Sequence, residues 1–148
     1  MATMAANRVF VDTNILVYSA VPTAPLHAAA VQRLAALRNT GDELWISRQI
    51  LREYAATQTR PQTFGSPVPG ATVAADLVAL QAAFRIAEDG PPVTAYLVNL
   101  LTTIPVGGKQ VHDANIVATM LTYNLSRLLT HNTADFARFS AFITVEAL

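Results

Sequence analysis

The sequence predicts an α/β fold, in which one domain forms an α/β/α sandwich around a mostly parallel sheet of about five strands. Short strand-like runs alternate with helical patterns along the whole chain, as they do where parallel strands are joined by helices. The first run, Arg8–Val11, is apolar after its arginine, which is typical of a central strand with both faces buried. A length of 148 residues, 52% of them hydrophobic, suits a single domain over residues 1–148.

Capping residues and prolines divide the first half of the chain into elements. Asp12 follows the first strand and can cap a short helical turn, Pro25 can open a longer helix, and Ser47 can cap a third. That third helix must stop before Pro61, because the residue before a proline avoids helical geometry. The expected elements are a strand over 8–11, helices over 15–18 and 25–39, a strand over 44–47 and a helix over 48–59.

The second half continues the alternation. Residues 61–70 combine prolines and glycines and are expected to form the longest loop. Pro91 can open a helix that ends before Pro105, and regular apolar spacing predicts a helix over 109–123. The other expected elements are a helix over 72–81, strands over 83–87, 128–130 and 142–145, and a turn with a short helix within 131–138.

Composition limits the classes of function and location. The formal net charge is zero, so any contact with nucleic acid must come from a local patch. The absence of cysteine excludes disulfides and thiolate metal sites and is compatible with a cytoplasmic location. Residues 1–7 lack a charged start and a long apolar run, so we expect no signal peptide. No apolar stretch is long enough for a membrane span. The low charged fraction, 14%, suggests an oligomer or a partner protein.

Four of the ten acidic residues are expected to meet at one edge of the sheet. Asp12 directly follows the first strand, and Asp135 follows the fourth strand by about one turn. Glu53 lies early in the helix after the second strand, and Asp113 lies early in the helix before the fourth. Helices between parallel strands begin at the edge where strands end, and ligands of open parallel sheets bind at that edge. The four acids therefore mark the candidate site.

The chemistry of such a cluster points to a divalent cation. Carboxylates held close together raise one another's pKa, and a cation relieves that repulsion. Oxygen ligands without a Cys or His cluster suit Mg²⁺ or Mn²⁺ rather than zinc. These ions serve phosphodiester cleavage, because they activate water for attack and can stabilise the leaving oxygen.

Each acid also has a structural interpretation. Asp12 can act only as a turn or helix cap, and Asp113 can pair with Lys109 one turn earlier. For these two residues the functional interpretation is favoured, because each stands beside apolar sequence. Taken alone, Glu53 suits an ion pair with a neighbouring arginine on a solvated face, and Asp135 suits a helix cap.

Around these acids the sequence resembles the PIN-domain family, in blocks that follow the family's order. The blocks are VFVDTNILVY at 9–18, ILREY at 50–54, VHDANIVA at 111–118, and LTHNTADF at 129–136 followed by FITV at 142–145. In size and motif order the chain looks most like the VapC toxins of bacterial toxin–antitoxin pairs.

The resemblance implies a PIN-like endoribonuclease that depends on Mg²⁺ or Mn²⁺. Its catalytic acids would be Asp12, Glu53, Asp113 and Asp135, and all but Glu53 would bind metal. It further implies a homodimer, structured RNA as the substrate, and a VapB-type antitoxin that blocks the site.

Two polar residues would support these acids, and a third departs from the family pattern. Asn14 and Thr130 would hold Asp12 and the metal shell through hydrogen bonds. Many relatives carry an acid where this sequence has Asn132, and the nearest acid here is Asp135. Either Asn132, through its carbonyl or a water, or Asp135 would complete the metal site.

Two arginines lie just before Glu53. Arg48 and Arg52 stand one helical turn apart and suit contacts with RNA phosphates or an antitoxin carboxylate. They suit an ordinary solvated helix face equally well.

Three other classes of function compete with a nuclease. A catalytically weak PIN-like module that binds RNA or protein would explain the neutral charge and Asn132, but the retained acids argue against it. A nucleotide-binding protein on a similar sheet would need a glycine-rich phosphate loop, which the sequence lacks. A phosphatase with Asp12 as nucleophile would need a second aspartate where Asn14 stands.

Overall fold

The computed structural model of the protein describes residues 7–148. Of the segment 1–7, for which no signal peptide is expected, residues 1–6 lie outside the described part. Within that part, no helix combines the length and the apolar character that crossing a membrane requires.

A five-stranded sheet forms the centre of the molecule. Its strands are β1 (Arg8–Val11), β2 (Glu43–Ser47), β3 (Arg85–Ala87), β4 (Arg127–Leu129) and β5 (Thr144–Glu146). They stand in the order β3-β2-β1-β4-β5, and every pair in the sheet is parallel. The predicted α/β class and parallel sheet are therefore confirmed.

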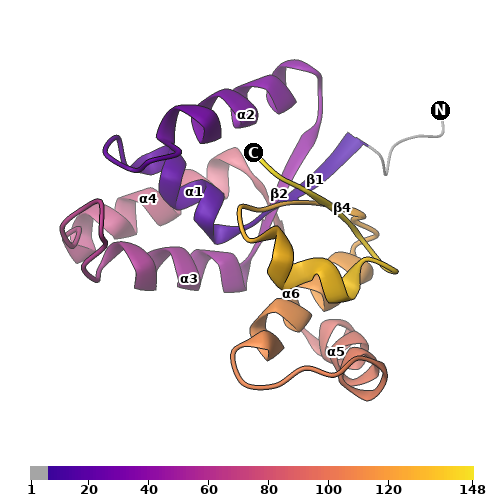
Figure 1. The fold of residues 1–148 in the computed structure, drawn as a ribbon. Helices are drawn as coiled ribbons and strands as arrows, with labels where there is room; N and C mark the ends of the chain where they lie inside the picture. The colour runs from indigo at the N-terminus through magenta and orange to yellow at the C-terminus, as the bar shows by residue number, and fades with distance from the viewer. Residues whose placement is uncertain (1–6) are drawn as a thin grey trace.

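Helices cover both faces of this sheet (Figure 1). They are α1 (Thr13–Ala20), α2 (His27–Asn39), α3 (Arg48–Gln58), α4 (Gly70–Ala83), α5 (Pro91–Thr103), α6 (Gln110–Thr122) and the 3-10 helix η2 (Thr133–Phe139). Helices α1 to α4 pack together on one side, and α5, α6 and η2 pack on the other. The strand order explains the division, because right-handed crossovers place helices on opposite faces when the chain reverses direction across the sheet.

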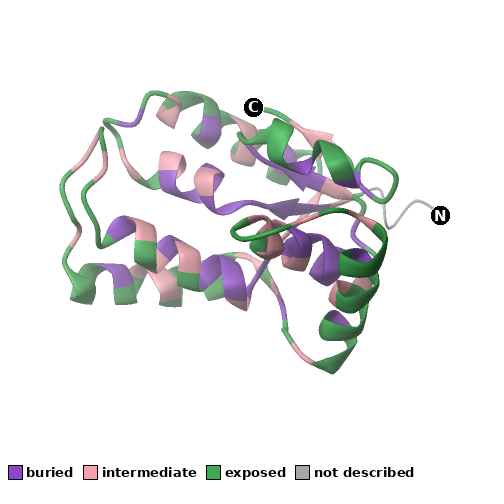
Figure 2. Cartoon of the chain, turned by 60° about the horizontal axis from the view of Figure 1, so that its bottom comes forward, coloured by how far each residue is buried: buried purple, intermediate pink, exposed green. Residues whose placement is uncertain are grey.

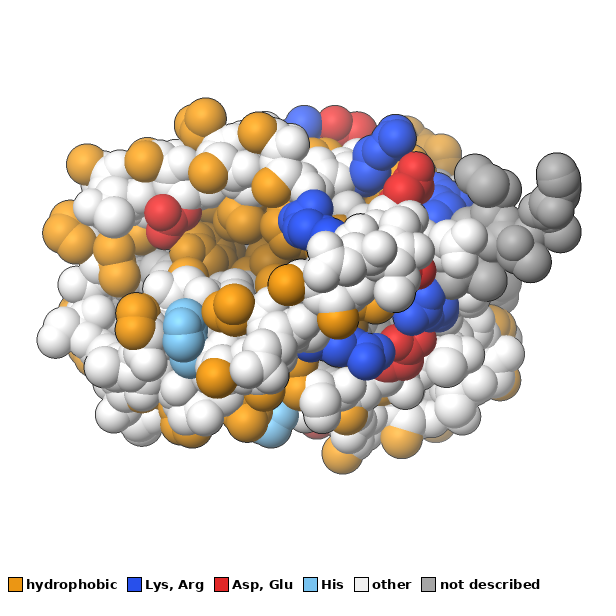
Figure 3. Space-filling view, turned by 90° about the horizontal axis from the view of Figure 1, so that it is seen from above, with side chains coloured by type: hydrophobic (Ala, Val, Ile, Leu, Met, Phe, Trp, Pro, Cys, Tyr) orange, Lys and Arg blue, Asp and Glu red, His pale blue; other side chains and the backbone are white. Residues whose placement is uncertain are grey.

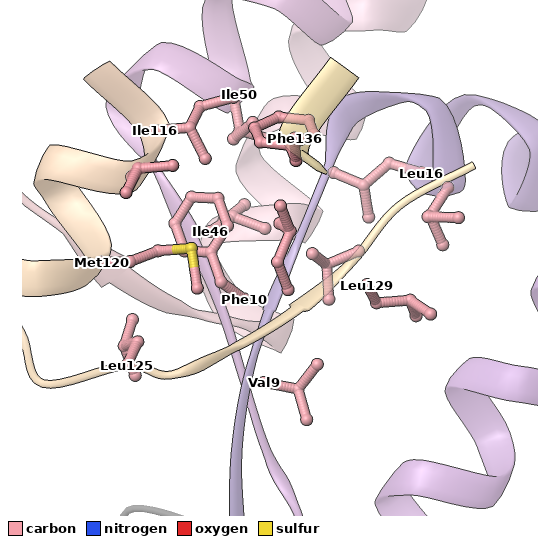
Figure 4. Close-up of a cluster of buried hydrophobic side chains, with 14 of the residues drawn as sticks. Val9, Phe10, Leu16, Ile46, Ile50, Ile116, Met120, Leu125, Leu129 and Phe136 are labelled. Atoms are coloured by element: carbon pink, nitrogen blue, oxygen red, sulfur yellow. The ribbon is translucent and has the colours of Figure 1, made fainter. Parts of the chain in front are cut away.

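The core lies on both faces of β1. Val9, Phe10 and Val11 are all fully buried, as expected for a central strand, and burial of each large side chain contributes about 1.5–3 kcal/mol. Phe10 lies beside Met120 of α6 (Figure 4). In Figure 2 the strands are largely buried, and the outward faces of the helices are exposed.

Some boundaries differ from those expected from the sequence. Helix α1 has eight residues instead of a single turn, because Ile15 and its apolar neighbours continue into the core. Helix α4 runs from Gly70 to Ala83 and is longer at both ends than predicted. The last strand begins at Thr144 instead of residue 142, because the backbone N–H groups of Phe142 and Ile143 donate to the carbonyl of Phe139 and continue the turn of η2.

The topology creates a crevice at the carboxyl edge of the sheet. The chain runs outward from β1 to β2 and β3 and then returns to β4 on the other side of β1. Ligands in open parallel sheets bind where the strand order reverses in this way. Asp12 follows β1 and Thr130 follows β4, so both stand at this point.

Candidate active site

A pocket of about 600 Å³ opens at the reversal point of the sheet. Three of the predicted acids line it: Asp12 after β1, Glu53 on α3 and Asp113 on α6. These residues are 41 and 60 positions apart in sequence order (53 − 12 and 113 − 53), and only the folded sheet brings them together.

Asp12 lines the pocket and caps α1. Its Oδ1 accepts a hydrogen bond of 2.7 Å from the backbone N–H of Thr13, and its Oδ2 accepts one of 2.7 Å from the hydroxyl of Thr130. The side chain is only 6% exposed. Burial raises the pKa of Asp12, the charge of Glu53 raises it further, and the hydrogen bonds oppose both effects.

Asn14 and Thr130 connect the start of α1 to the end of β4. The amide of Asn14 donates to Asp12 Oδ2 at 3.2 Å and to the Thr130 hydroxyl at 3.3 Å, and its carbonyl accepts from the N–H of His131 at 3.0 Å. The Thr130 hydroxyl also accepts from the N–H of Asn132. This network fixes the Asp12 carboxylate against two elements.

Glu53 is held by one hydrogen bond on each carboxylate oxygen. The hydroxyl of Thr13 donates to Oε1 and the amide of Gln49 donates to Oε2, both at 2.9 Å. The same Gln49 amide donates to the backbone carbonyl of His112, and Asn115 donates to the Gln49 carbonyl at 2.8 Å. Gln49 therefore ties Glu53 on α3 to the turn of α6 that carries Asp113.

Asp113 is the acid whose charge is least compensated. Its pKa is raised to about 6, first by burial and then by the charges of Asp135, Asp12 and Glu53. Within residues 7–148 its carboxylate accepts no hydrogen bond, and no ion pair joins it to Lys109. The structural alternative for Asp113, an ion pair with Lys109, is therefore not formed in the described residues.

Asp135 and Asn132 stand at the rim. Asn132 lines the pocket, whereas Asp135 is exposed on η2 outside it. Asp135 is nevertheless near enough to be the largest charge effect on the pKa of Asp113. The two candidates for the fourth position thus differ in placement. Asn132 lines the cavity, whereas Asp135 lies outside it and affects the site through its charge.

The arginines at 48 and 52 lie away from the pocket. Arg48 forms two hydrogen bonds of 2.9 and 2.8 Å with Glu88 and a third of 2.9 Å with Gln81. Arg52 is exposed. Neither residue lines the cavity that holds the acids.

Two basic side chains outside the predicted site, Arg60 and Lys109, also line the pocket, and so does His112 beside Asp113. Lys109 could have been indicated by its spacing, because it stands four residues before Asp113. Arg60 lies beyond the end of α3 at Gln58 and has no such signal. The same spacing of four separates Gln49 from Glu53.

The donor set of the pocket fits a hydrated divalent cation. Within residues 7–148, no group of three or more Asp, Glu or His side chains is placed so that it could hold a metal ion. Mg²⁺ usually keeps several waters and is held by one or two carboxylates together with substrate phosphates. Asp12, Glu53, Asp113 and the carbonyl of Asn132 offer oxygen ligands of that kind, partly through water.

Solved structures share this fold. One is VapBC2 from Rickettsia felis bound to a DNA fragment from their promoter, with a TM-score of 0.70, 20% identity, and coverage of 95% of this chain and 98% of that chain. Another is the Mycobacterium tuberculosis toxin VapC20, which cleaves the sarcin-ricin loop, with a TM-score of 0.68, 16% identity, and coverage of 92% and 96%. A toxin–antitoxin complex from Klebsiella pneumoniae has a TM-score of 0.63, 22% identity, and coverage of 92% and 96%.

Sequence comparison identifies the family. No curated protein is similar enough in sequence to count as a relative of this chain. The model of the PIN domain, however, matches residues 9–141, which include all four sequence blocks that carry the acids. Because this match covers well over half of its length, the chain belongs to the PIN domain family.

Proposed function

We propose that the protein is a metal-dependent endoribonuclease and the toxin of a type II toxin–antitoxin pair, with Mg²⁺ or Mn²⁺ as its cofactor. The proposal treats residues 1–148 as one ribonuclease domain. The observation that carries it is the convergence of Asp12, Glu53 and Asp113 in one pocket, with an Asp113 carboxylate that has no hydrogen-bond donor in the described chain. The reaction is hydrolysis of an RNA phosphodiester bond by water.

Each acid has a role suited to its surroundings. Asp12 and Asp113 hold the cation, helped at the rim by Asn132 or Asp135. When bound, the cation supplies positive charge that activates water and stabilises the leaving oxygen. Glu53, fixed through both oxygens, orients the attacking water and accepts its proton.

A local group of basic side chains would bind the RNA. Arg60 and Lys109 line the pocket and can bind phosphates on either side of the scissile bond, and His112 can donate a hydrogen bond there. A net charge of zero is compatible with RNA binding of this kind, because positive charge stands beside the acids where cleavage would occur. Arg48, which Glu88 and Gln81 already engage, is a weaker candidate for this contact.

Three further observations support protein partners. Several structures that share the fold are complexes, among them a toxin–antitoxin complex, which supports a VapB-type antitoxin here. Seen from above, the molecule shows a hollow with an apolar floor, surrounded mostly by hydrophobic and uncharged side chains (Figure 3). Helix α5 also exposes Tyr96, Val98 and Leu101, which supports a homodimer. With RNA as substrate and an antitoxin as partner, the proposed place of action is the cytoplasm.

The test is cleavage of total cellular RNA by the purified protein with Mg²⁺, with Mn²⁺ and with a chelator. Asp113→Asn removes one carboxylate of the pocket without changing its size. Glu88→Gln is the matched control, because Glu88 follows β3 at the same edge of the sheet but is paired with Arg48 outside the pocket.

We expect discrete fragments that need metal, vanish with Asp113→Asn and persist with Glu88→Gln. Cleavage that survives in Asp113→Asn would mean that the pocket is not the active site. RNA binding without cleavage in any metal would instead support the alternative, a PIN-like binding module.

A further inference from the structure

The pocket has a second wall that the acids do not form. Tyr18 of α1 and Phe64 of the loop between α3 and α4 line the cavity, beside Arg60. The two rings meet edge to face, with centroids 6.0 Å apart and an interplanar angle of 65°. The rings of His131 and Tyr18 also meet edge to face, with centroids 5.5 Å apart. One pocket therefore combines a charged end and an aromatic end.

This aromatic wall is held in place by the backbone around it. The hydroxyl of Thr23 donates to the carbonyl of Phe64, and the amide of Gln62 donates to the carbonyl of Thr57 at 2.6 Å. Gln62 and Gly65 pair as an isolated bridge that closes the loop tip. The loop thus presents Phe64 from a fixed position.

Tyr18 and Phe64 differ from an aromatic residue of the core. Tyr54, a structural tyrosine, is 2% exposed, and its hydroxyl donates to Asp76 at 2.8 Å. Tyr18 and Phe64 pack against the core, but they are only partly buried and also line the cavity. Within residues 7–148 the hydroxyl of Tyr18 has no hydrogen-bond partner. Each ring therefore keeps surface that a ligand in the cavity can contact.

We propose that Tyr18 and Phe64 form a subsite for one nucleobase next to the scissile phosphate, and that Arg60 binds a neighbouring phosphate. This inference rests on the proposed ribonuclease function. Aromatic side chains bind bases of single-stranded RNA by stacking, and a base inside a paired stem does not expose its face. The substrate is therefore RNA whose nucleotide at the cleavage site is unpaired, in a loop or a single strand.

The test measures binding of a short single-stranded RNA by fluorescence anisotropy, in the Asp113→Asn background so that the RNA stays intact. A series of the same RNA has one nucleotide at a time made abasic. The variants are Tyr18→Leu and Phe64→Leu, each with a measured unfolding curve. Phe142→Leu is the matched control, because Phe142 is an exposed aromatic residue outside both the pocket and α5.

We expect one abasic position to weaken binding by about 5- to 100-fold in the parent protein. Tyr18→Leu and Phe64→Leu should weaken binding of the intact RNA by a similar factor, yet bind that abasic RNA no worse than the parent does. Tyr18→Phe should keep the parent's affinity, and so should Phe142→Leu. If Tyr18→Leu does not fold, Phe64→Leu, in the surface loop, provides the same comparison.

The proposed subsite is wrong if no abasic position weakens binding. It is also wrong if the losses of binding free energy caused by the abasic nucleotide and by Tyr18→Leu add when the two changes are combined. Cleavage of RNA by the wild-type protein, assayed separately, distinguishes two failures. If the wild-type protein cleaves RNA but all abasic RNAs bind equally well, only the proposed subsite is wrong. If the wild-type protein neither cleaves nor binds RNA, the proposed ribonuclease function is wrong as well.

Discussion

The carboxylate of Asp113 is a site where function opposes stability. Burial and three neighbouring acids raise its pKa from 3.8 to about 6, so its ionised form is less stable in the folded protein than in the unfolded chain. Below 3.8 the group is protonated in both states and its ionisation has no effect. Stability is lost as the pH rises towards 6, and the full loss is present above that value.

Asp113→Asn should therefore stabilise the metal-free protein at neutral and alkaline pH. Solvent partly screens the Asp113 carboxylate, which reduces the effect of its raised pKa on stability. We therefore expect a gain of about 1 kcal/mol in the free energy of unfolding at about pH 8. The gain should disappear near pH 4, below the raised pKa. Urea unfolding with a chelator at both pH values measures it. An equal gain at both values would show that the ionised charge is not its cause.

Thr130 is the main support of Asp12. Thr130→Val removes the donor to Asp12 Oδ2 and the acceptor for Asn14 and Asn132, so we expect a loss of about 1–3 kcal/mol in unfolding free energy. Thr130→Ser, which keeps the hydroxyl, should lose much less. Urea unfolding of the two variants is the measurement, and equal losses would mean that packing of the methyl group matters more than the hydrogen bonds.

The sequence could predict individual acids better than their partners. Asp12 and Asp113 were found because each follows or precedes a strand in a way that fixes its edge of the sheet. Gln49 and Arg60 were not predicted. The spacing of four between Gln49 and Glu53 does not by itself show that the two side chains bond, and Arg60 lies beyond the end of α3, where spacing gives no signal. The pairing of Arg48 with Glu88 could not be predicted either, because Glu88 follows a different strand and lies 40 residues away in sequence.

At the scale of elements, α3 and α6 are connected through Gln49. Its side chain is 5% exposed and bonds to Glu53, to the carbonyl of His112 and to Asn115. The relative position of Glu53 and Asp113 therefore depends on one buried amide that belongs to neither acid.

Gln49→Leu should destabilise the protein by about 2 kcal/mol, because buried polar groups lose their partners, and should slow RNA cleavage because Glu53 is released. Gln58→Leu is the matched control: Gln58 is also buried on α3, but it bonds to Tyr54 at the far end of the helix. Unfolding free energy and kcat are measured for both. If the two variants slow cleavage equally, Gln49 has only a structural role.

Element boundaries could be predicted where capping chemistry decides them. Ser47 caps α3 through the N–H of Ile50, as its position in the sequence indicated. The predicted start of β5 was wrong. The backbone N–H of Phe142 closes a turn onto Phe139 instead of pairing in the sheet, and Phe139 is held there by tertiary packing that the local sequence does not show. Helix α4 was underestimated, since alanine-rich ends carry no stop signal of their own.

At the scale of the whole molecule, the alternation of strands and helices was enough to predict the fold class. Charge placement was less predictable. Residues 90–108 contain no charged side chain, and of the six exposed large hydrophobic residues in the described chain, α5 carries Tyr96, Val98 and Leu101. Helix α5 lies on the outer side of α6 (Figure 1), where an apolar surface of this kind favours association.

Leu101→Glu should convert the expected dimer to a monomer, because a carboxylate on this surface would be buried against a second copy without a partner. Val31→Glu introduces the same charge at an equally exposed valine of α2 and should leave the assembly unchanged. Sedimentation velocity of both variants and the wild-type protein measures the difference. A wild-type monomer, or a dimer that persists in Leu101→Glu, would contradict the assignment of α5 to the interface.

The central claim is that Asp12, Glu53 and Asp113 together form a metal-dependent ribonuclease site. The most direct measurement is the rate of cleavage of one RNA fragment as a function of Mn²⁺ concentration, for wild-type protein, Asp12→Asn, Asp113→Asn and Glu88→Gln. We expect a rate that saturates with Mn²⁺ in the wild-type protein and in Glu88→Gln, and that falls by more than about 100-fold in the other two variants. Cleavage without metal, or at the wild-type rate in Asp113→Asn, would contradict the claim.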